Sequence, residues 1–462
     1  MCKLSEETVK DILSKGRIYE VGGAVRDRFL ENVTVKDRDY LVTGVSYDEL
    51  SNILGRYGRV DLVGKSFGVI KFTQYSANLP HTFDISLPRR EHSTGEGHKD
   101  FAIDFDPTLP VEEDLVRRDF TINAMALALD NDELIDPLNG MDDLKKRILR
   151  MTSEDSFVDD PLRMMRAVQF SARFNLTIEP HTLDAMQRHA ARIQTVSNER
   201  IADELNKLMH AGKTSEGFRL MQRVGLLKEI LPELEECVGI EQPGGYHKYD
   251  VFEHTLHAID AAPPRLRLRM AALFHDITKP RHRRLVDNGA TFYGHEISGA
   301  KIARKALSRL RYPKDFINEV SVLVERHMFT TDVGDKGLRR LIRKVGIDLI
   351  FDLLELRRID VEAQGMGGTT DDVDEFEAAI REELSKKPPF GYSDLALHGE
   401  DIMRILNLKQ GPSVGKVLEH LMEAVLDDPS QNTAKRLEQI AREYYSQNID
   451  SMNSANDEES VR

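Results

Sequence analysis

The hydrophobic pattern changes its period near residue 160, and this change restricts the fold more than any other feature. Before it, short runs rich in β-branched and aromatic residues end at Gly or Pro, which is typical of strands: RIYEVGG, RDYLVTG, GVIKF and TFDISL. After it, apolar residues recur at three- and four-residue spacing, which predicts helices, in PLRMMRAVQFSARF, ERIADELNKLMHA and GFRLMQRVGLL. We therefore expect an α+β head followed by an all-α remainder.

The chain has 462 residues, too many for one hydrophobic core and enough for roughly three domains. We predict a head at 1–148, a helical neck and body at 149–245, a His-rich helical unit at 246–365, a helical C-terminal region at 366–445 and a disordered tail at 446–462. Within these, TINAMALAL is expected to be helical and GTTDDVDEF to be a loop.

Composition restricts the setting of the protein. Cys2 and Cys237 are the only cysteines, so we expect neither a disulfide framework nor a thiolate zinc site. The N-terminus lacks the apolar segment of a secretory signal, and no apolar run approaches the length of a membrane span. We expect a cytoplasmic protein without a membrane partner. The sequence leaves its oligomeric state open.

The net charge of −14 argues mildly against nucleic-acid binding, because phosphate contacts need Lys and Arg. Basic residues nevertheless gather in RHRR (281–284) and in GLRRLIRK (337–344). An RNA site on this chain would have to be a local basic surface on an acidic body.

The segment EVGGAVRDRFL combines a strand, a Gly-Gly turn and a helix start. Gly22 and Gly23 let the backbone approach a ligand closely. The helix N-terminus then offers free N–H groups to a phosphate, and Arg26 adds positive charge one turn later. A plain tight turn is the alternative.

Acidic residues follow on the next predicted strand. Asp37 and Asp39 alternate in KDRDYLVTG, and a period of two places both carboxylates on one face. Such a pair can hold two Mg²⁺ ions that clamp the attacking and leaving oxygens of a phosphoryl transfer. Asp84, in TFDISLPRRE, is either a third catalytic carboxylate or a solvent-facing strand residue.

GGAVRD followed by KDRD resembles the first motif of the polymerase-β nucleotidyltransferase superfamily. More narrowly, the chain is similar to the bacterial (class II) tRNA nucleotidyltransferases and the related bacterial poly(A) polymerases. Further similar motifs follow in the family's order: PRREHSTGEGHKDFAIDFDP, EEDLVRRDFTINAMA, IDPLNGMDDLKKRILR, DDPLRMMRAVQFSARF and SNERIADEL. The resemblance covers roughly the first 230 residues.

This resemblance implies a head with a mixed sheet, of the polymerase-β type, and two groups of site residues. It implies that Asp37 and Asp39 hold magnesium. It also implies a nucleotide-binding set, which we take to be Gly22, Gly23, Arg26, Arg117, Arg118, Asp119, Asp160, Arg163 and Arg166. For Arg117 and Arg118 a solvated basic pair is the alternative, although a guanidinium there could clamp triphosphate oxygens.

The segment 159–166 can select a base without a template. Pro161 suits the first position of a helix and Asp160 its N-cap, with Arg163 and Arg166 at three-residue steps on one face. A carboxylate accepts hydrogen bonds and a guanidinium donates them, which matches the amino group and ring nitrogen of cytosine and adenine. Guanine and uracil present the opposite order and leave both groups unpaired.

This segment has one alternative interpretation and one departure from the family's motif. Asp160 can act simply as a helix cap, with the arginines solvated. The family's motif begins with Glu–Asp, whereas this chain has Asp159–Asp160, a change at the supporting position and not at the base-reading pair. Arg166, one turn further along the helix, could hold the ribose or a phosphate.

A second constellation lies downstream. His254, the pair His275–Asp276, His295, His327 and Asp360 occupy predicted helices. Imidazole with carboxylate suits Mn²⁺, Fe²⁺, Ni²⁺, Co²⁺ or Mg²⁺. The arrangement resembles the HD phosphohydrolase superfamily, which implies His254, His275, Asp276 and Asp360 as metal ligands and His295 with His327 at a second metal or a phosphate.

The HD resemblance has one departure and one alternative. The usual HDIGKP is HDITKP here, so Thr278 replaces a glycine and predicts less tight helix packing. The alternative is a purely structural remnant of the HD unit. If it is active, a metal-bound hydroxide could hydrolyse phosphate mono- or diesters, for instance at damaged tRNA ends.

The leading hypothesis is an enzyme that adds CCA to tRNA from CTP and ATP. Poly(A) polymerase shares the head, but the acidic tail and the HD unit disfavour it. Partial enzymes that add only CC or only A are further alternatives, and the loop 89–106 favours complete CCA addition by analogy. An HD phosphohydrolase with an RNA-binding head is the alternative from another class.

The carboxylates give the first testable prediction. We expect Asp37→Ala and Asp39→Ala each to abolish nucleotide addition while folding and tRNA binding persist, because the metals lose a ligand and the fold does not. Primer-extension and filter-binding assays measure the two effects. Full activity in either variant would contradict the prediction that Asp37 and Asp39 hold two Mg²⁺ ions.

Overall fold

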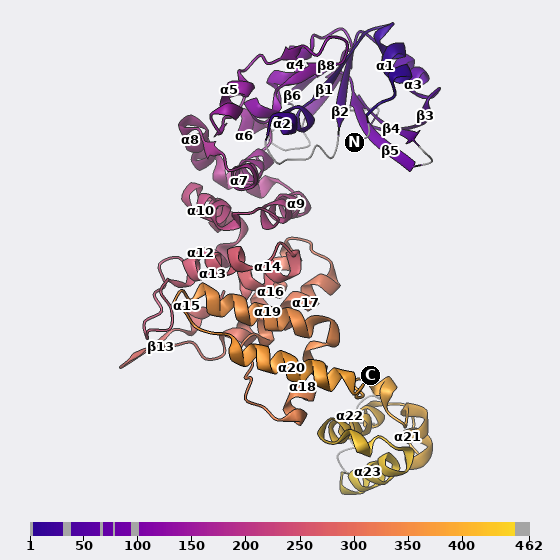
Figure 1. Ribbon diagram of the computed structural model, residues 1–462, viewed down its shortest axis with the longest axis vertical. Coiled ribbons are helices and arrows are strands. Elements are labelled where there is room, and N and C mark those ends of the chain that lie inside the picture. The colour runs from indigo at the N-terminus through magenta and orange to yellow at the C-terminus, as the bar shows by residue number, and fades with distance from the viewer. Residues whose placement is uncertain (1–2, 31–37, 65–67, 77–78, 94–100, 449–462) are drawn as a thin grey trace. The chain divides into compact units, whose positions relative to one another are not determined.

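The computed structural model describes residues 3–30, 38–64, 68–76, 79–93 and 101–448. Two compact units compose the chain (Figure 1). Unit 1 comprises Met1–Glu236 with Arg309–Tyr312, and unit 2 comprises Cys237–Ser308 with Pro313–Arg462. Strands of the large sheet lie in the first part of unit 1, and unit 2 is built mainly of helices. The predicted α+β head followed by helical parts is confirmed.

A seven-stranded mixed sheet forms the head, in the order β3-β4-β5-β2-β1-β8-β9. β2 and β5 run parallel, and the other neighbouring pairs run antiparallel. The strands are β1 (Arg17–Val21), β2 (Asp39–Thr43), β3 (Gly58–Gly64), β4 (Val69–Ser76), β5 (Leu79–Ser86), β8 (Ala126–Ala128) and β9 (Leu134–Ile135). The four strand-like runs of the sequence therefore became β1, β2, β4 and β5.

The prediction of a helix for TINAMALAL was wrong. A 3₁₀ turn at Thr121–Asn123 leads directly into β8, which pairs with β1 in the sheet. All three residues of β8 are buried. A strand covered on both faces is apolar without alternation, and over a short run this pattern cannot be told from a buried helix.

The two faces of the sheet pack against different elements. Ile18, Tyr40 and Val42 belong to a core that includes residues of α1 and α3. Tyr19 and Val21 lie on the opposite face with Leu115 of α4. Because side chains alternate along a strand, Asp39 projects on this second face.

Short helices and a hairpin complete the head, and a helical segment follows it within unit 1. The head contains α1 (Glu6–Leu13), α2 (Gly23–Phe29), α3 (Tyr47–Leu54), α4 (Val111–Val116), α5 (Gly140–Lys145) and the hairpin β6 (Arg89–Ser93) with β7 (Phe101–Phe105). The following segment contains β10 (Ile148–Leu149), α6 (Ser156–Asp159), α7 (Leu162–Phe174), β11 (Thr177–Ile178), α8 (Pro180–His189), α9 (Asn198–Met209), α10 (Thr214–Val224), α11 (Leu226–Ile230) and α12 (Pro232–Glu235).

Unit 2 begins with the His-rich helices. They are α13 (Val251–Ala261), α14 (Leu266–Phe274), α15 (Lys279–His282), α16 (His295–Arg309), α17 (Lys314–Arg326), α18 (Asp335–Val345) and α19 (Ile347–Ala363). A small hairpin, β12 (Arg284–Val286) with β13 (Gly289–Thr291), interrupts them. None of the helices in the described residues has the length and apolarity that crossing a bilayer requires.

Helices α21 (Gly399–Leu406), α22 (Pro412–Asp427) and α23 (Ala434–Gln447) form a core of their own within unit 2. Helix α20 (Asp371–Ser385) precedes them and contacts α18 and α19. GTTDDVDEF is not wholly a loop as predicted, because α20 begins at Asp371. The acidic run fits the positive end of the helix dipole there. Residues 449–462 of the predicted tail lie outside the described residues.

The basic run GLRRLIRK forms α18 and is used internally. Arg339 is buried, donates to the carbonyls of Leu426 and Asp427, and pairs with Glu383 at 2.9 Å. Arg340 pairs with Glu423 at 2.8 Å. These arginines attach α18 to α20 and α22, so their positive charge is partly neutralised by acids of the same unit.

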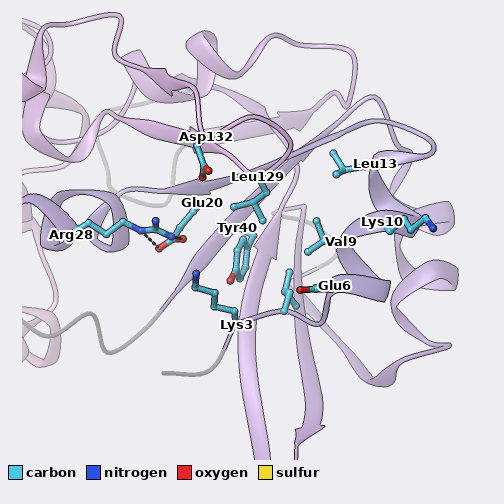
Figure 2. Close-up of a pocket in the computed structure, with 11 residues that line it drawn as sticks. Lys3, Glu6, Val9, Lys10, Leu13, Glu20, Arg28, Tyr40, Leu129 and Asp132 are labelled. Atoms are coloured by element: carbon cyan, nitrogen blue, oxygen red, sulfur yellow. Dashed lines mark hydrogen bonds and ion pairs between the residues drawn. The ribbon is translucent and has the colours of Figure 1, made fainter.

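The face of the sheet that carries α1 and α3 contains a hollow of about 350 Å³ (Figure 2). Glu20, the register partner of Tyr40, lies at this hollow with only 1% of its surface exposed. Its carboxylate pairs with Arg38 at 2.6 Å and with Arg28. One buried acid thus satisfies two arginines behind the sheet.

This cluster gives a stability prediction. Glu20→Ala should lower the free energy of unfolding of the head by about 3 kcal/mol, because the buried Arg38 loses its counter-charge. Lys10→Ala, at an exposed position of the same hollow, should change it by less than about 0.5 kcal/mol. Denaturant titration of the full chain measures both. Equal stability of the two variants would show that the ion pairs contribute nothing.

Candidate functional sites

A hollow of about 570 Å³ in unit 1 collects residues that are distant in the sequence. Most of the predicted site lines it: Gly22, Gly23, Arg26, Asp39, Asp84, Arg117, Arg118, Asp119, Asp160, Arg163 and Arg166. Asp37 lies outside the described residues. Asn123, Phe170 and Arg200 also line the hollow, and the sequence analysis did not single them out.

The Gly-Gly turn forms one wall of this hollow. Gly22 has a φ of 68°, in the left-handed region where glycine is favoured. A Cβ at Gly22 would lie 2.6 Å from Nη1 of Arg118. The glycine therefore permits both the turn and the close approach of a guanidinium to the backbone.

Two carboxylates lie side by side on adjacent strands of the head. Asp39 of β2 and Asp84 of β5 are register partners in the parallel pair, and both line the hollow. The Nζ of Lys71 lies 3.7 Å from Oδ1 of Asp84, whose side chain is about half exposed. Asp84 thus lies beside Asp39 at the hollow, and its role as a third catalytic carboxylate stays a prediction.

Buried acids hold the arginines in place. Asp114 of α4 is fully buried and accepts hydrogen bonds from Arg117 and, at 3.1 Å, from Nη2 of Arg118. Burial alone would raise the pKa of Asp114, but the two guanidinium groups hold it below its ordinary value. The arginines are thus fixed on an ionised carboxylate beneath them and face the hollow on the other side.

Asp119 connects the end of the head with helix α7. Its Oδ2 accepts from Nε of Arg166 at 2.8 Å, and its Oδ1 accepts from Nδ2 of Asn123 at 2.9 Å. Asn123 in turn accepts from Nη1 of Arg26 at 2.7 Å. Burial would raise the pKa of Asp119, but Arg166 and Asn123 hold it low. Asp119 therefore positions two arginines and is itself almost covered.

The base-reading pair has partners of its own. Oδ1 of Asp160 accepts from the backbone N–H of Leu162 at 3.1 Å, as a helix cap does, and Oδ2 pairs with Arg200 at 2.9 Å. Arg163 donates to Oγ of Ser156 at 3.0 Å and to the carbonyl of Arg117 at 2.9 Å. Both side chains line the hollow in a fixed orientation, and base recognition by them stays a prediction.

Arg200 was missed although its segment, SNERIADEL, was noticed. It lies on α9, and only the packing of α9 against α7 brings it to Asp160. Asn123 was missed because the wrongly predicted helix gave it no special place. No sequence signal separates these two residues from ordinary polar residues.

The predicted HD residues converge in unit 2. His254, His275, Asp276 and Asp360 place one possible ligand atom each within 4.8 Å of one another, and all four are buried. Oδ1 of Asp360 lies 3.1 Å from Nε2 of His254, and Oδ2 of Asp276 lies 3.2 Å from Nε2 of His275. The four side chains come from α13, the end of α14 and α19.

A second cluster shares Asp276. It consists of Asp276, His295 and His327, again buried. Oδ1 of Asp276 lies 3.2 Å from Nε2 of His295, while its Oδ2 faces the first cluster. One carboxylate thus lies between two groups of imidazoles.

The tautomers of these histidines suit cation binding. The Nδ1 atoms of His275, His295 and His327 lie 2.7–2.8 Å from the carbonyls of Ala272, Phe292 and Val324. When Nδ1 carries the proton and donates it, Nε2 has a free lone pair that points into the cluster. Nε2 atoms of His254 and His275 lie 3.1 Å apart, and those of His295 and His327 3.2 Å. Between His295 and His327 two lone pairs face each other, and they need a proton or a cation between them.

The charges in the clusters lead to the same conclusion. Burial would lower the pKa of His275, but the carboxylates of Asp276 and Asp360 raise it to about 10. Burial lowers the pKa of His327 to about 3. The first cluster therefore attracts positive charge strongly, and a divalent cation would supply it.

Thr278 does not loosen the packing, contrary to the expectation for a residue in place of glycine. It is buried, its hydroxyl donates to the carbonyl of His295 at 2.8 Å, and its Oγ1 lies 2.8 Å from Oγ of Ser298. The threonine thus ties the start of α16 to the His275–Asp276 segment. Lys279, which sequence reasoning missed, lies with Nζ 2.7 Å from Asp276 and donates to Gln242 at 2.7 Å.

Known families match three segments of the chain. Residues 18–150 match the poly A polymerase head domain, residues 175–238 a probable RNA- and SrmB-binding site of polymerase A, and residues 246–365 the HD domain. Among solved structures, the Bacillus stearothermophilus CCA-adding enzyme in complex with CTP is similar in fold, with a TM-score of 0.69 at 20% identity. That match covers 96% of this chain and 97% of the other.

Curated relatives are closer in sequence. The A-adding tRNA nucleotidyltransferase of Deinococcus radiodurans is 38% identical over 343 residues, which span 70% of this chain and 77% of the relative. The CC-adding tRNA nucleotidyltransferase of Thermus thermophilus is 36% identical, over 68% and 73%. The multifunctional CCA protein of Nitrosococcus oceani is 37% identical, over 67% and 74%. The family predicted from the motifs is confirmed: this chain belongs to the tRNA nucleotidyltransferases, with a head of the poly(A) polymerase type and an HD domain.

Proposed function

We propose that this protein adds CCA to the 3′ ends of tRNA from CTP and ATP, in the cytoplasm and without a nucleic-acid template. The observation that carries the proposal is the hollow in unit 1, where Asp39 and Asp84 lie beside arginines from the head and from α7. Carboxylates for metal and guanidinium groups for triphosphate are the two needs of nucleotidyl transfer.

The residues of the hollow have separate tasks in this proposal. Asp37 and Asp39, with Asp84 beside them, would hold Mg²⁺, which lowers the barrier by neutralising charge on the reacting phosphate. Arg117 and Arg118 would bind the triphosphate. Nε of Arg118 is buried without a hydrogen-bond partner in the described residues, so a ligand oxygen would satisfy it. Arg26, which donates to Asn123, would add positive charge for the phosphates of the incoming nucleotide.

Base selection would follow from fixed orientation. Asp160 is held by Arg200, and Arg163 by Ser156 and the carbonyl of Arg117. A carboxylate and a guanidinium fixed in this way offer an acceptor and donors at constant positions. Cytosine and adenine match them, and guanine and uracil do not. Arg166, held by Asp119, would contact the ribose or a phosphate.

The number and kind of nucleotides added distinguish the proposed function from the related activities. The relatives are named for A addition, CC addition and multifunctional CCA activity. We favour complete CCA addition because the segment 89–106 carries the whole loop motif. Poly(A) synthesis is the alternative with the same head.

A second activity is proposed for the HD domain, namely hydrolysis of phosphate mono- or diesters at RNA ends. The observation that favours it is the pair of clusters around Asp276. Mn²⁺, Ni²⁺, Co²⁺ or Mg²⁺ would suit these imidazole and carboxylate donors. When bound, such a metal supplies a hydroxide for attack on phosphorus. Lys279, beside Asp276, would neutralise the phosphate.

One experiment tests the main proposal. The protein is incubated with tRNA transcripts that end before CCA, after C and after CC, each with single labelled nucleotides. Complete CCA addition requires CTP incorporation on the first two and ATP incorporation on the third. Incorporation of C alone or of A alone identifies a partial enzyme, and long A tails identify a poly(A) polymerase.

Base selection gives a quantitative prediction. Arg163→Ala and Asp160→Ala should each reduce discrimination of C and A against U and G by about ten- to a hundred-fold, because a charge-assisted hydrogen bond is lost. Arg118→Ala should instead slow all four nucleotides alike, since phosphate is common to them. The measurement is kcat/KM for CTP, ATP, UTP and GTP. Equal slowing of all nucleotides by the first two variants would reduce Asp160 to a helix cap.

The HD domain gives an independent prediction. Asp276→Ala should remove hydrolysis of 2′,3′-cyclic and 2′-phosphate ends, because both clusters lose their shared ligand, while CCA addition continues. With each candidate metal, opening of the 2′,3′-cyclic phosphate to a phosphomonoester is followed by chromatography of the RNA, and hydrolysis of the 2′-phosphate by release of inorganic phosphate. If the unaltered protein hydrolyses neither end with any of these metals, the HD domain is structural.

A further inference from the structure

Large apolar and aromatic side chains are exposed together beside the HD clusters. Tyr293 has 86% of its surface exposed and Tyr246 76%. Leu285 and Val286, on the β12–β13 hairpin, are 69% and 51% exposed. Strand β13 projects away from the helices of unit 2 (Figure 1). Neither the hydrolysis proposed above nor the packing of unit 2 uses these side chains.

Backbone contacts place both tyrosines at this hairpin. The N–H of Ala290 in β13 donates to the carbonyl of Pro243 at 3.0 Å, so the turn that precedes Tyr246 lies against the strand. A Cβ on Gly289 would lie 2.6 Å from that same carbonyl, and the close approach therefore needs glycine. Tyr293 follows β13, and Nδ1 of His282 donates to its carbonyl at 2.9 Å.

Each tyrosine is also a near neighbour of the histidine clusters. His247, next to Tyr246, packs its ring edge-on against the ring of His254 at 4.8 Å. His295, two residues after Tyr293, lies 3.2 Å from Asp276. Tyr246 is therefore next to a residue that packs against the first cluster, and Tyr293 is two residues from a member of the second.

Two adjacent arginines lie where the hairpin begins. Arg283 and Arg284 have no ion pair with any described residue, in contrast to the arginines of α18, which pair with Glu383 and Glu423. Nε of Arg283 is buried without a hydrogen-bond partner in the described part of the chain. Of the two basic runs in the sequence, only RHRR thus keeps arginines available to a ligand.

We propose that Tyr246, Tyr293 and Arg284 form a binding surface for the single-stranded 3′ end of an RNA and present its terminal phosphate to the HD clusters. Bases stack on exposed aromatic rings, and guanidinium groups bind the phosphates between them. The proposal rests on the hydrolase activity proposed for the HD domain. It names the substrate class, a short single strand with a terminal phosphate.

Kinetics on two substrates test this surface. One is a four-nucleotide RNA with a 2′,3′-cyclic phosphate, and the other is bis(p-nitrophenyl) phosphate, which has no bases. Tyr246→Ala and Tyr293→Ala should each raise KM for the RNA about ten-fold, with kcat and the small diester unaffected. Tyr246→Phe and Tyr293→Phe keep the ring and should match the unaltered protein. CCA addition should not change in any variant.

Photocross-linking tests binding without turnover. A four-nucleotide RNA with a terminal 3′-phosphate and 4-thiouridine is irradiated with the full chain in EDTA, and peptides are mapped by mass spectrometry. Cross-links within 243–248 or 284–293 are expected, and the two alanine variants should lose them.

The outcomes separate the two proposals. If the unaltered protein hydrolyses neither substrate but forms the cross-links, the hydrolase activity fails and the RNA surface stands. If it hydrolyses the RNA while the alanine variants keep its KM and no cross-link forms there, the surface is overturned. A change of sedimentation in the alanine variants, with hydrolysis of RNA unaltered, would also overturn it and assign the patch to a protein contact.

Discussion

The ion pair between Asp119 and Arg166 determines the arrangement of unit 1. Asp119 stands where the head's helix α4 gives way to the turn before β8, and Arg166 lies on α7. The same carboxylate accepts a hydrogen bond from Asn123, and the side-chain oxygen of Asn123 accepts one from Arg26. Since a buried carboxylate requires full hydrogen bonding, its partners have little freedom. The Gly-Gly turn, the arginines of the head and helix α7 therefore meet at one hollow.

A shared carboxylate has the corresponding role in unit 2. The two oxygens of Asp276 face different groups of imidazoles, and Lys279 lies against one of them. Thr278 holds the first turn of α16 through the carbonyl of His295. A glycine could not make this hydrogen bond, so the departure from the usual HD motif adds a connection beside the cluster.

Charge is distributed according to these tasks. The chain is acidic overall, with a net charge of −14, yet many arginines are paired with specific acids. Arg117 and Arg118 share Asp114, Arg38 and Arg28 share Glu20, and Arg339 pairs with Glu383. Such pairs fix positions more than they add net stability. Net charge therefore says little about where this protein binds phosphate, because the positions of individual arginines are fixed by specific acids.

The sequence by itself determined the fold class, the family and most of the residues that line the two sites. Periodicity and turn residues are local properties, so the strands β1, β2, β4 and β5 and the long helices could be predicted from them. Gly22, Asp39 and the His275–Asp276 pair belong to short motifs whose chemistry depends on neighbours in the sequence. Thr278 was noticed for the same reason, although its effect on packing was predicted wrongly.

Tertiary structure alone decided which residues meet across long separations. Arg200 reaches Asp160 only because α9 packs against α7, and Asp84 lies beside Asp39 only because β5 adds parallel to β2. TINAMALAL became a strand because the sheet offered β1 as a hydrogen-bonding partner. The arginines of α18 became paired with acids of α20 and α22 once these helices packed against α18. In each case the stabilising contacts join segments that are distant in the sequence. Local sequence patterns therefore could not predict them.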